Sequence, residues 1–268
     1  MFGAFHPAEG DTRAPGVLIC GPYGQEAVRA HRMLRVLADR LSRSGCDVLR
    51  FDPYGSGDAS GDDIELSLPG WSADVLLASE ELRRRSSARE QVWVGARLGG
   101  TAACLAACLA HRPPASLVLC EPVLEGAAYL TSLAQATVQT LEASCSIRDA
   151  LWRATLQSDP ERWEREAVGF SMGEALHRQL QALQPDGVQV PKGTRVALLS
   201  SGSGGTFEAQ ARRWREQGAL ATHEALDFPF DWTAEEALNT ALVPHEMLQR
   251  LAERALQEVG AAQPERAA

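Results

Sequence analysis

The stretch QVWVGARLGGTAACLAACLA, residues 91–110, places the strongest constraint on how this chain can fold. It begins with a short apolar run typical of a buried strand, and its second half is rich in the small residues that suit a helix. Gly95 and Gly99 flank the junction, and glycine permits tight turns that few other residues adopt. The stretch therefore predicts a strand over 91–94 that turns sharply into a helix over 98–110.

The same alternation of strand and helix recurs along most of the chain. Strands are predicted over residues 16–21, 47–52, 91–94, 117–122, 195–200 and 222–228, and helices over 26–44, 71–85, 98–110, 207–216 and 245–259. Strands and helices that alternate at these lengths indicate βαβ units and a mostly parallel sheet. Because the strands are almost uninterruptedly apolar, we expect helices on both faces of the sheet.

Between residues 124 and 191 helical periodicity replaces the alternation. Helices are expected there over 129–143, 146–156 and 172–183, with Trp152, Trp163 and Phe170 as large apolar anchors. A helical insertion between two strands of one sheet is most simply a cap over the strand ends. We therefore expect a core of residues 1–123 and 192–260, a helical cap of residues 124–191, and a frayed tail from 261 to 268.

Charge and cysteine content narrow the environment and the partners. The formal charge of −9 argues against non-specific nucleic-acid binding, because such binding needs an excess of Lys and Arg. No apolar run reaches the roughly 18 residues of a membrane span, and the N-terminus lacks a signal-peptide pattern. The six cysteines include no CxxC pair. This favours reduced thiols in the cytoplasm, and we expect no metal and no cofactor.

With these elements in place, the sequence resembles the α/β-hydrolase superfamily, and within it the serine-aminopeptidase-like branch. The resemblance rests on GPYG at 21–24, RFDPYGSGDASGD at 50–62, Trp71 with Asp74, GARLGG at 95–100, and the insertion after the fourth strand. It implies the α/β-hydrolase fold, which is a mostly parallel twisted sheet with helices on both faces, here with a helical cap insertion.

A narrower resemblance is to the exosortase A system-associated hydrolases. It is carried by GARLGG with arginine in the turn, by LVLCEPVLEGAAYL at 117–130 and by AVGFSMGEALHRQL at 167–180. These proteins are encoded near bacterial exopolysaccharide genes. The resemblance therefore implies a genomic neighbourhood and not a particular reaction.

Hydrolases of this fold use a nucleophile, an acid and a histidine, in that order along the chain. At the nucleophile position this chain has Arg97, whose guanidinium stays protonated and cannot attack a carbonyl. The acid is expected after the strand that follows the insertion, where residues 199–205 read LSSGSGG without a carboxylate. The histidine is expected after the last strand, where residues 228–232 read FPFDW. The absence of all three groups predicts a fold used for something other than triad hydrolysis.

Three other residues are weak candidates for catalysis. Ser203 lies in a Gly-rich loop with no identifiable base, and His245 opens the last helix. Cys20 ends a strand, and a thiol needs a partner that lowers its pKa before it becomes a nucleophile. Four other histidines are predicted to be surface residues: His31, His111, His177 and His223.

Arg97 is better explained as the resident of an anion-binding pocket. The backbone N–H of Leu98, at the start of a helix, and the turn at Tyr23 and Gly24 would supply further donors. A buried arginine needs a partner, which leaves two alternatives: an internal ion pair, or a clamp on a carboxylate, phosphate or sulfate of a ligand. The carboxylates expected nearest to it are those of Glu121, Asp52 and Asp58.

Three functions are compatible with these features. The first is a catalytically inactive or atypical homologue that acts as an accessory or ligand-binding protein in a bacterial biosynthetic pathway, with a small anionic or acyl ligand under the cap. The second is an ester or thioester hydrolase, or an acyl-transfer enzyme, that uses non-standard residues. The third is a structural subunit that docks a protein partner.

Overall fold

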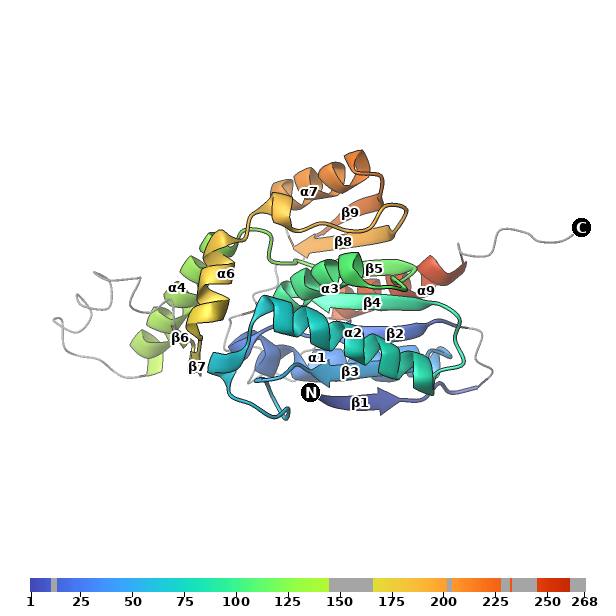
Figure 1. Ribbon diagram of the computed structural model, residues 1–268, viewed down its shortest axis with the longest axis horizontal. Helices are drawn as coiled ribbons and strands as arrows, with labels where there is room; N and C mark the ends of the chain where they lie inside the picture. The colour runs from blue at the N-terminus through green and yellow to red at the C-terminus, as the bar shows by residue number, and fades with distance from the viewer. Residues whose placement is uncertain (11–13, 145–165, 202–203, 228–231, 233–244, 261–268) are drawn as a thin grey trace, which may run out of the picture.

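A computed structural model of the protein describes residues 1–10, 14–144, 166–201, 204–227, 232 and 245–260. These residues form a seven-stranded sheet in the order β1-β3-β2-β4-β5-β8-β9 (Figure 1). Its strands are β1 (Phe2–His6), β2 (Gly16–Cys20), β3 (Val48–Asp52), β4 (Gln91–Ala96), β5 (Ser116–Cys120), β8 (Arg195–Ser201) and β9 (Leu220–Leu226). All neighbouring pairs from β3 to β9 are parallel, which confirms the predicted mostly parallel sheet.

Helices cover both faces of this sheet, as the apolar strands predicted (Figure 1). They are α1 (Gly24–Arg43), α2 (Leu68–Arg85), α3 (Arg97–Leu109), α7 (Gly205–Glu216) and α9 (His245–Gly260). The period-two alternation of a strand divides its side chains between two cores. In β2, Leu18 and Cys20 belong to the core under α2, α3 and α7, whereas Val17 and Ile19 belong to the core under α1 and α9.

The edge strand β1 was not predicted from the sequence. It pairs antiparallel with β3, with Phe2 opposite Asp52 and His6 opposite Val48. None of its five residues is fully buried, and Phe2 is 50% exposed, so β1 lacks the buried apolar run of the central strands. A short, exposed edge strand gives a weak sequence signal for this reason.

The insertion after β5 contains α4 (Gly126–Ser144), the two-residue strands β6 (Glu166–Ala167) and β7 (Phe170–Ser171), and α6 (Glu174–Ala182). The helices α4 and α6 pack on each other beyond the carboxyl ends of the parallel strands (Figure 1). Two of the three helices expected there are present. The third, over 146–156, and the expected tail at 261–268 lie outside the described residues.

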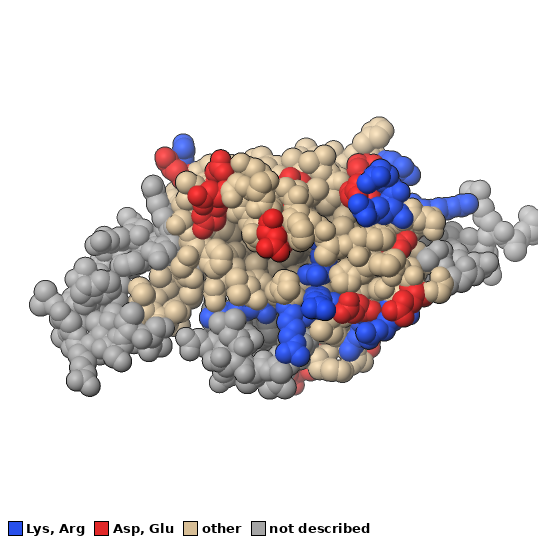
Figure 2. Space-filling model, turned by 90° about the horizontal axis from the view of Figure 1, so that it is seen from below, with Lys and Arg blue, Asp and Glu red and all other residues tan. Residues whose placement is uncertain are grey.

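The surface mixes charges of both signs. On the face that Figure 2 shows, the described Lys and Arg side chains lie among Asp and Glu side chains and do not form one continuous basic surface. None of the described helices combines the length and apolar character that crossing a bilayer requires.

Candidate functional site

The turn between β4 and α3 brings Arg97 to the carboxyl edge of the sheet. Strand and helix meet without a linker, and Arg97 has a left-handed φ of +52°. This conformation costs an L-residue about 1–2 kcal/mol. The neighbouring glycines make the turn sterically feasible: a Cβ on Gly99 would lie 1.9 Å from the carbonyl oxygen of Gly21, and one on Gly95 would lie 2.5 Å from the Cα of Gly100.

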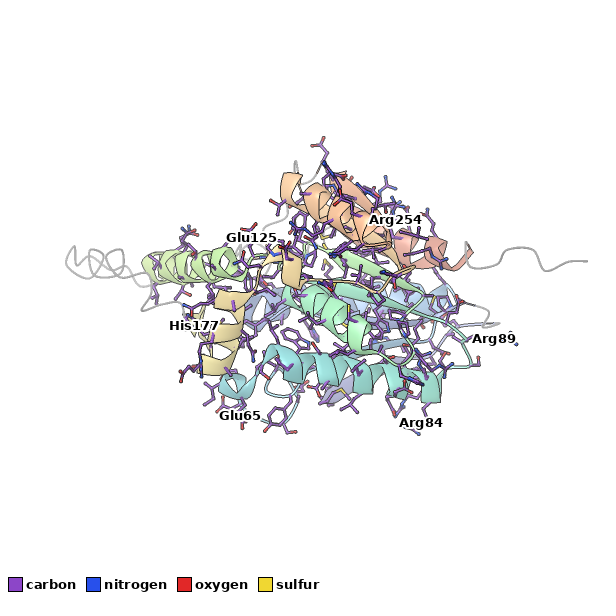
Figure 3. The ribbon with its side chains drawn as sticks, turned by 45° about the horizontal axis from the view of Figure 1, so that its top comes forward. Glu65, Arg84, Arg89, Glu125, His177 and Arg254 are labelled. Atoms are coloured by element: carbon purple, nitrogen blue, oxygen red, sulfur yellow. The ribbon has the colours of Figure 1, made fainter. Side chains whose placement is uncertain are left out.

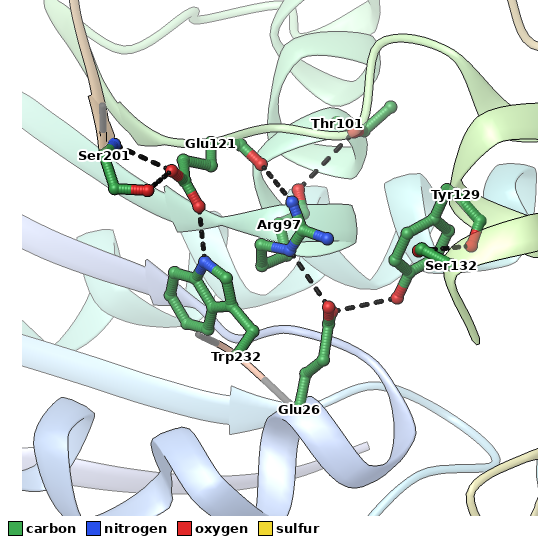
Figure 4. Close-up of polar contacts among 8 residues, drawn as sticks. All are labelled: Glu26, Arg97, Thr101, Glu121, Tyr129, Ser132, Ser201 and Trp232. Carbon is green, nitrogen blue, oxygen red and sulfur yellow. Dashed lines mark hydrogen bonds and ion pairs between the residues drawn. The ribbon is translucent and has the colours of Figure 1, made fainter. Parts of the chain in front are cut away.

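Arg97 forms an internal ion pair with Glu26 of α1. Its Nε donates to Oε1 of Glu26 at 3.0 Å, and the hydroxyl of Tyr129 in α4 donates to Oε2 at 2.9 Å (Figure 4). Both charged side chains are removed from water, with 18% of Arg97 and 2% of Glu26 exposed. The guanidinium also faces the rings of Tyr129 and Trp232, with Cζ 5.4 and 5.9 Å from the ring centroids.

The burial of this pair shifts the pKa values of its members in ways that keep Arg97 charged. Burial alone would lower the pKa of Arg97, but the carboxylate of Glu26, with smaller contributions from Tyr129 and Glu121, raises it above the ordinary value. Burial raises the pKa of Glu26, against the opposing effect of Arg97 and Tyr129. The guanidinium is therefore a permanent cation whose charge is balanced inside the protein.

The carboxylates named from the sequence are not the ion-pair partner of Arg97. Asp52 accepts a hydrogen bond from the backbone N–H of Asp58 at 3.0 Å, and neither bonds to Arg97. Glu121 contributes its backbone oxygen, which accepts from Nη1 of Arg97 at 3.4 Å. Glu26 escaped prediction because nothing in one sequence tells which residue of the first helix faces the turn at 97.

The carboxylate of Glu121 has its own set of donors. Its Oε1 accepts from the backbone N–H of Ser201 at 2.7 Å and from the Ser201 hydroxyl, and its Oε2 accepts from Nε1 of Trp232 at 2.6 Å (Figure 4). Glu121 follows β5 directly and, like Arg97, has a left-handed φ, of +44°. Glu121 is one of the three carboxylates expected near Arg97, and it follows β5, one strand before the segment 199–205 where the acid of a triad was sought.

Trp232 stands in the segment where the histidine was expected. Its indole N–H donates to the Glu121 carboxylate and its ring faces the Arg97 guanidinium, so Trp232 contacts both residues. A histidine in a triad makes the same two connections. An indole nitrogen only donates, however, and cannot take up a proton. Arg97, Glu121 and Trp232 therefore make a connected set with no nucleophile in the turn and no imidazole, and its one proton acceptor, the Glu121 carboxylate, is already engaged by Ser201 and Trp232.

A cavity of about 300 Å³ opens beside this set. Its lining comes from the segment after β5, from α4 and from the start of α7, and includes Arg97, Leu124, Glu125, Tyr129, Ser132 and Phe207. Glu125, labelled in Figure 3, is exposed and lies just before α4. The lining thus combines apolar surface with one cation and a few hydrogen-bonding groups.

The other residues expected to bind an anion do not share this cavity. Tyr23 and Gly24 line a separate cavity of about 300 Å³ together with the Gly-rich loop after β3 and Phe170. The hydroxyl of Tyr23 donates to the backbone oxygen of Ser171 at 3.1 Å. Leu98 is fully buried in the core. The structure therefore places Tyr23 and Gly24 at a different cavity from Arg97, whereas the backbone N–H of Leu98 directly follows Arg97 in the first turn of α3.

The three weak catalytic candidates gain no support from their surroundings. Cys20 is fully buried, and burial raises its pKa, so it has no tendency to form a thiolate. His245 is an exposed residue that begins α9, and it makes no hydrogen bond or ion pair with the described residues of the site. Ser203 lies outside the described residues.

A second hydrogen-bonded chain was missed from the sequence. Ser200 Oγ lies 2.9 Å from Nε2 of His223, and Nδ1 of His223 lies 3.2 Å from Oε2 of Glu208. The order of groups matches nucleophile, base and acid, yet Ser200 is completely buried and no substrate can reach it. The prediction that His223 and His177 are surface residues is wrong, since the His223 side chain is 6% exposed and His177 is buried.

No family model matches the chain, and a search among curated proteins finds no match. Solved structures match over nearly its whole length. Est1E from Butyrivibrio proteoclasticus with bound ferulic acid is 16% identical, with a TM-score of 0.64 over 96% of this chain and 95% of that one. A thermostable carboxyl esterase from Bacillus coagulans is 10% identical, with a TM-score of 0.61 over 96% and 94%. Alpha/beta hydrolase domain-containing protein 10 from mouse is 17% identical, with a TM-score of 0.53 over 94% and 93%. At such identities the likeness shows the fold alone, and the chain has the predicted α/β-hydrolase fold.

Proposed function

We propose that this protein uses the α/β-hydrolase fold to bind a small ligand without hydrolysing it. The observation that carries the proposal is the contact set of Arg97, Glu121 and Trp232. Acyl transfer needs a nucleophile that attacks and a base that takes its proton. A guanidinium cannot do the first and an indole cannot do the second, so the positions of the triad nucleophile and of the triad base both lack their agent.

The cavity beside Arg97 is the proposed binding site. Its volume of about 300 Å³ is at the small end of the range for small-molecule sites. Nη2 of Arg97 makes no hydrogen bond to the described residues and carries no dashed line in Figure 4, so it is available to an acceptor on a ligand. In this proposal the helical segment 124–191 acts as a cap, because α4 supplies Tyr129 and Ser132 to the cavity wall.

The setting we propose is an accessory role in a bacterial biosynthetic pathway linked to exopolysaccharide production, in the cytoplasm. The pathway is supported by the three segments that resemble exosortase A system-associated hydrolases, GARLGG among them. The compartment is supported by the cysteines, since the five described ones are all free thiols.

We predict that the purified protein hydrolyses p-nitrophenyl acetate no faster than an equal amount of Arg97→Ala or of an unrelated protein without an active site. The reason is that Ser132, the described serine that lines the cavity, donates to a backbone oxygen and not to a base that could activate it. The measurement is p-nitrophenol release against a buffer blank. Turnover above that of the unrelated protein which disappears in Ser200→Ala or His245→Ala would overturn the proposal and identify the group responsible.

A further inference from the structure

We infer that the cavity beside Arg97 selects uncharged carboxamides over carboxylates and phosphates. The inference rests on the proposed function, because it concerns what is held at the same site without being cleaved. It differs from the anion clamp expected from the sequence. The preference for an uncharged ligand over an anion follows from the charges that surround the guanidinium and from the hydrogen-bonding groups on the cavity wall.

The first argument is the charge around Arg97. The guanidinium is paired with the buried carboxylate of Glu26 at 3.0 Å, so its charge is already balanced. Glu121 adds a second carboxylate, held by Ser201 and Trp232, and Glu125 adds a third on the cavity wall. Arg97 is the only basic residue among the described residues that line the cavity. One positive and three negative formal charges leave no excess positive charge for an anion, and partial burial strengthens the repulsion.

The second argument is the pairing of donors and acceptors. Arg97 offers Nη2 as a donor, while Glu125 offers a carboxylate that can only accept. The hydroxyl of Ser132 donates to the backbone oxygen of Tyr129 at 2.7 Å, which leaves its lone pairs free to accept. A carboxamide presents a carbonyl oxygen for Arg97 and N–H groups for these acceptors. An ester lacks the N–H groups, and a carboxylate or phosphate lacks them and adds charge.

The third argument concerns the rest of the ligand. The remaining wall is mainly apolar, with Leu124, Ala128 and Phe207 among its residues. A short apolar or aromatic body beside the carboxamide therefore matches the cavity, as in most small-molecule sites.

Four compounds with the same ring test this selectivity: benzamide, methyl benzoate, benzoate and phenyl phosphate. Binding to the full-length protein is measured by saturation-transfer NMR with titration. We expect benzamide to bind tightest and methyl benzoate to bind more weakly. Benzoate and phenyl phosphate should bind at least roughly tenfold more weakly than benzamide, which is the difference in Kd expected from one unfavourable charge contact in a partly buried site. Glu125→Gln is expected to narrow the gap between benzamide and benzoate, because it removes a negative charge from the wall.

Two matched variants locate the site. Ala128→Trp places an indole in the cavity from an exposed position just inside α4 and is expected to abolish benzamide binding. Ala127→Trp makes the same change at the adjacent exposed residue, which does not line the cavity, and is expected to leave binding unchanged. Both variants should unfold at the same temperature as the natural protein.

The inference is overturned if benzoate or phenyl phosphate binds as tightly as benzamide, if none of the four compounds binds, or if the two tryptophan variants weaken binding equally. Failure of the proposed function gives a different signal in the same samples. Conversion of methyl benzoate to benzoate and methanol would show hydrolysis, whatever the order of affinities.

Discussion

Replacing Arg97 with methionine is expected to lower the free energy of unfolding by about 3–5 kcal/mol, the usual cost of removing one partner of a buried ion pair. The substitution leaves the Glu26 side chain 2% exposed, with the hydroxyl of Tyr129 as its one remaining hydrogen-bond partner among the described residues. Urea unfolding followed by tryptophan fluorescence measures the change. A loss below about 1 kcal/mol, which is typical of exposed ion pairs, would contradict the structural role of this pair.

The control for this variant removes both charges. The double variant Glu26→Gln/Arg97→Met should recover most of the loss, because an amide can still accept from Tyr129 and no buried charge remains. The penalty of the single variant should also depend on pH. Burial holds the native pKa of Glu26 above its ordinary value, and loss of Arg97 raises it further. The native state then binds a proton that the unfolded state does not, so the penalty should shrink as the pH falls through the native pKa.

Replacing Gly99 with alanine is expected to cost about 3 kcal/mol or more, above most single core substitutions. The added methyl group would lie 1.9 Å from the carbonyl oxygen of Gly21 and 2.6 Å from that of Cys20. Both are backbone atoms in the turn after β2, so neither can rotate away. Thermal and urea unfolding of the variant measure the effect, and the soluble yield should fall as well.

Gly205→Ala is the matched control. Gly205 begins α7, and a Cβ there would meet no atom within 4 Å. Alanine restricts the unfolded chain more than glycine does, so this change should be neutral or stabilise by about 0.4–1 kcal/mol. Equal destabilisation by the two substitutions would show that the close approach at Gly99 does not govern the stability of the turn.

Most of the fold was predictable because its elements have strong local signals. The central strands are continuous apolar runs. The turn between β4 and α3 is marked in the sequence by Gly95 and Gly99, at positions where an added Cβ would collide with backbone atoms. The edge strand β1 was missed because its residues are exposed or only half-buried and form no continuous buried run. Helix boundaries such as the start of α2 at Leu68 differ from prediction by a few residues, as expected for ends fixed by caps and by tertiary contacts.

The site was predictable only in part, because its contacts join residues far apart in sequence. The turn identified Arg97 as a residue that cannot be a nucleophile, and Glu121 was recognised as a nearby carboxylate. The partner in α1, Glu26, depends on how that helix is rotated over the sheet. The contact of Trp232 with Glu121 depends on the path of the chain after β9. Neither rotation nor path leaves a pattern in a single sequence.

The same limit explains why the hydrogen bonds that link Ser200, His223 and Glu208 were not predicted from the sequence. It requires the register between β8 and β9, in which Leu198 is opposite His223, and the position of α7 above both. Its geometry resembles that of a catalytic relay, but the burial of Ser200 separates it from any substrate. Because a substrate cannot reach Ser200, we interpret these three hydrogen-bonded residues as structural, even though their order matches that of a catalytic triad.

The most direct test of binding without hydrolysis is the intact mass of the protein after incubation with a fluorophosphonate, which reacts with activated serines. A serine esterase added to the same sample serves as the positive control. We predict full labelling of the esterase and no mass increase of this protein, because no described serine is both exposed to the cavity and bonded to a base. A stoichiometric adduct, mapped by peptide mass spectrometry to a serine such as Ser200 or Ser201, would contradict the proposal.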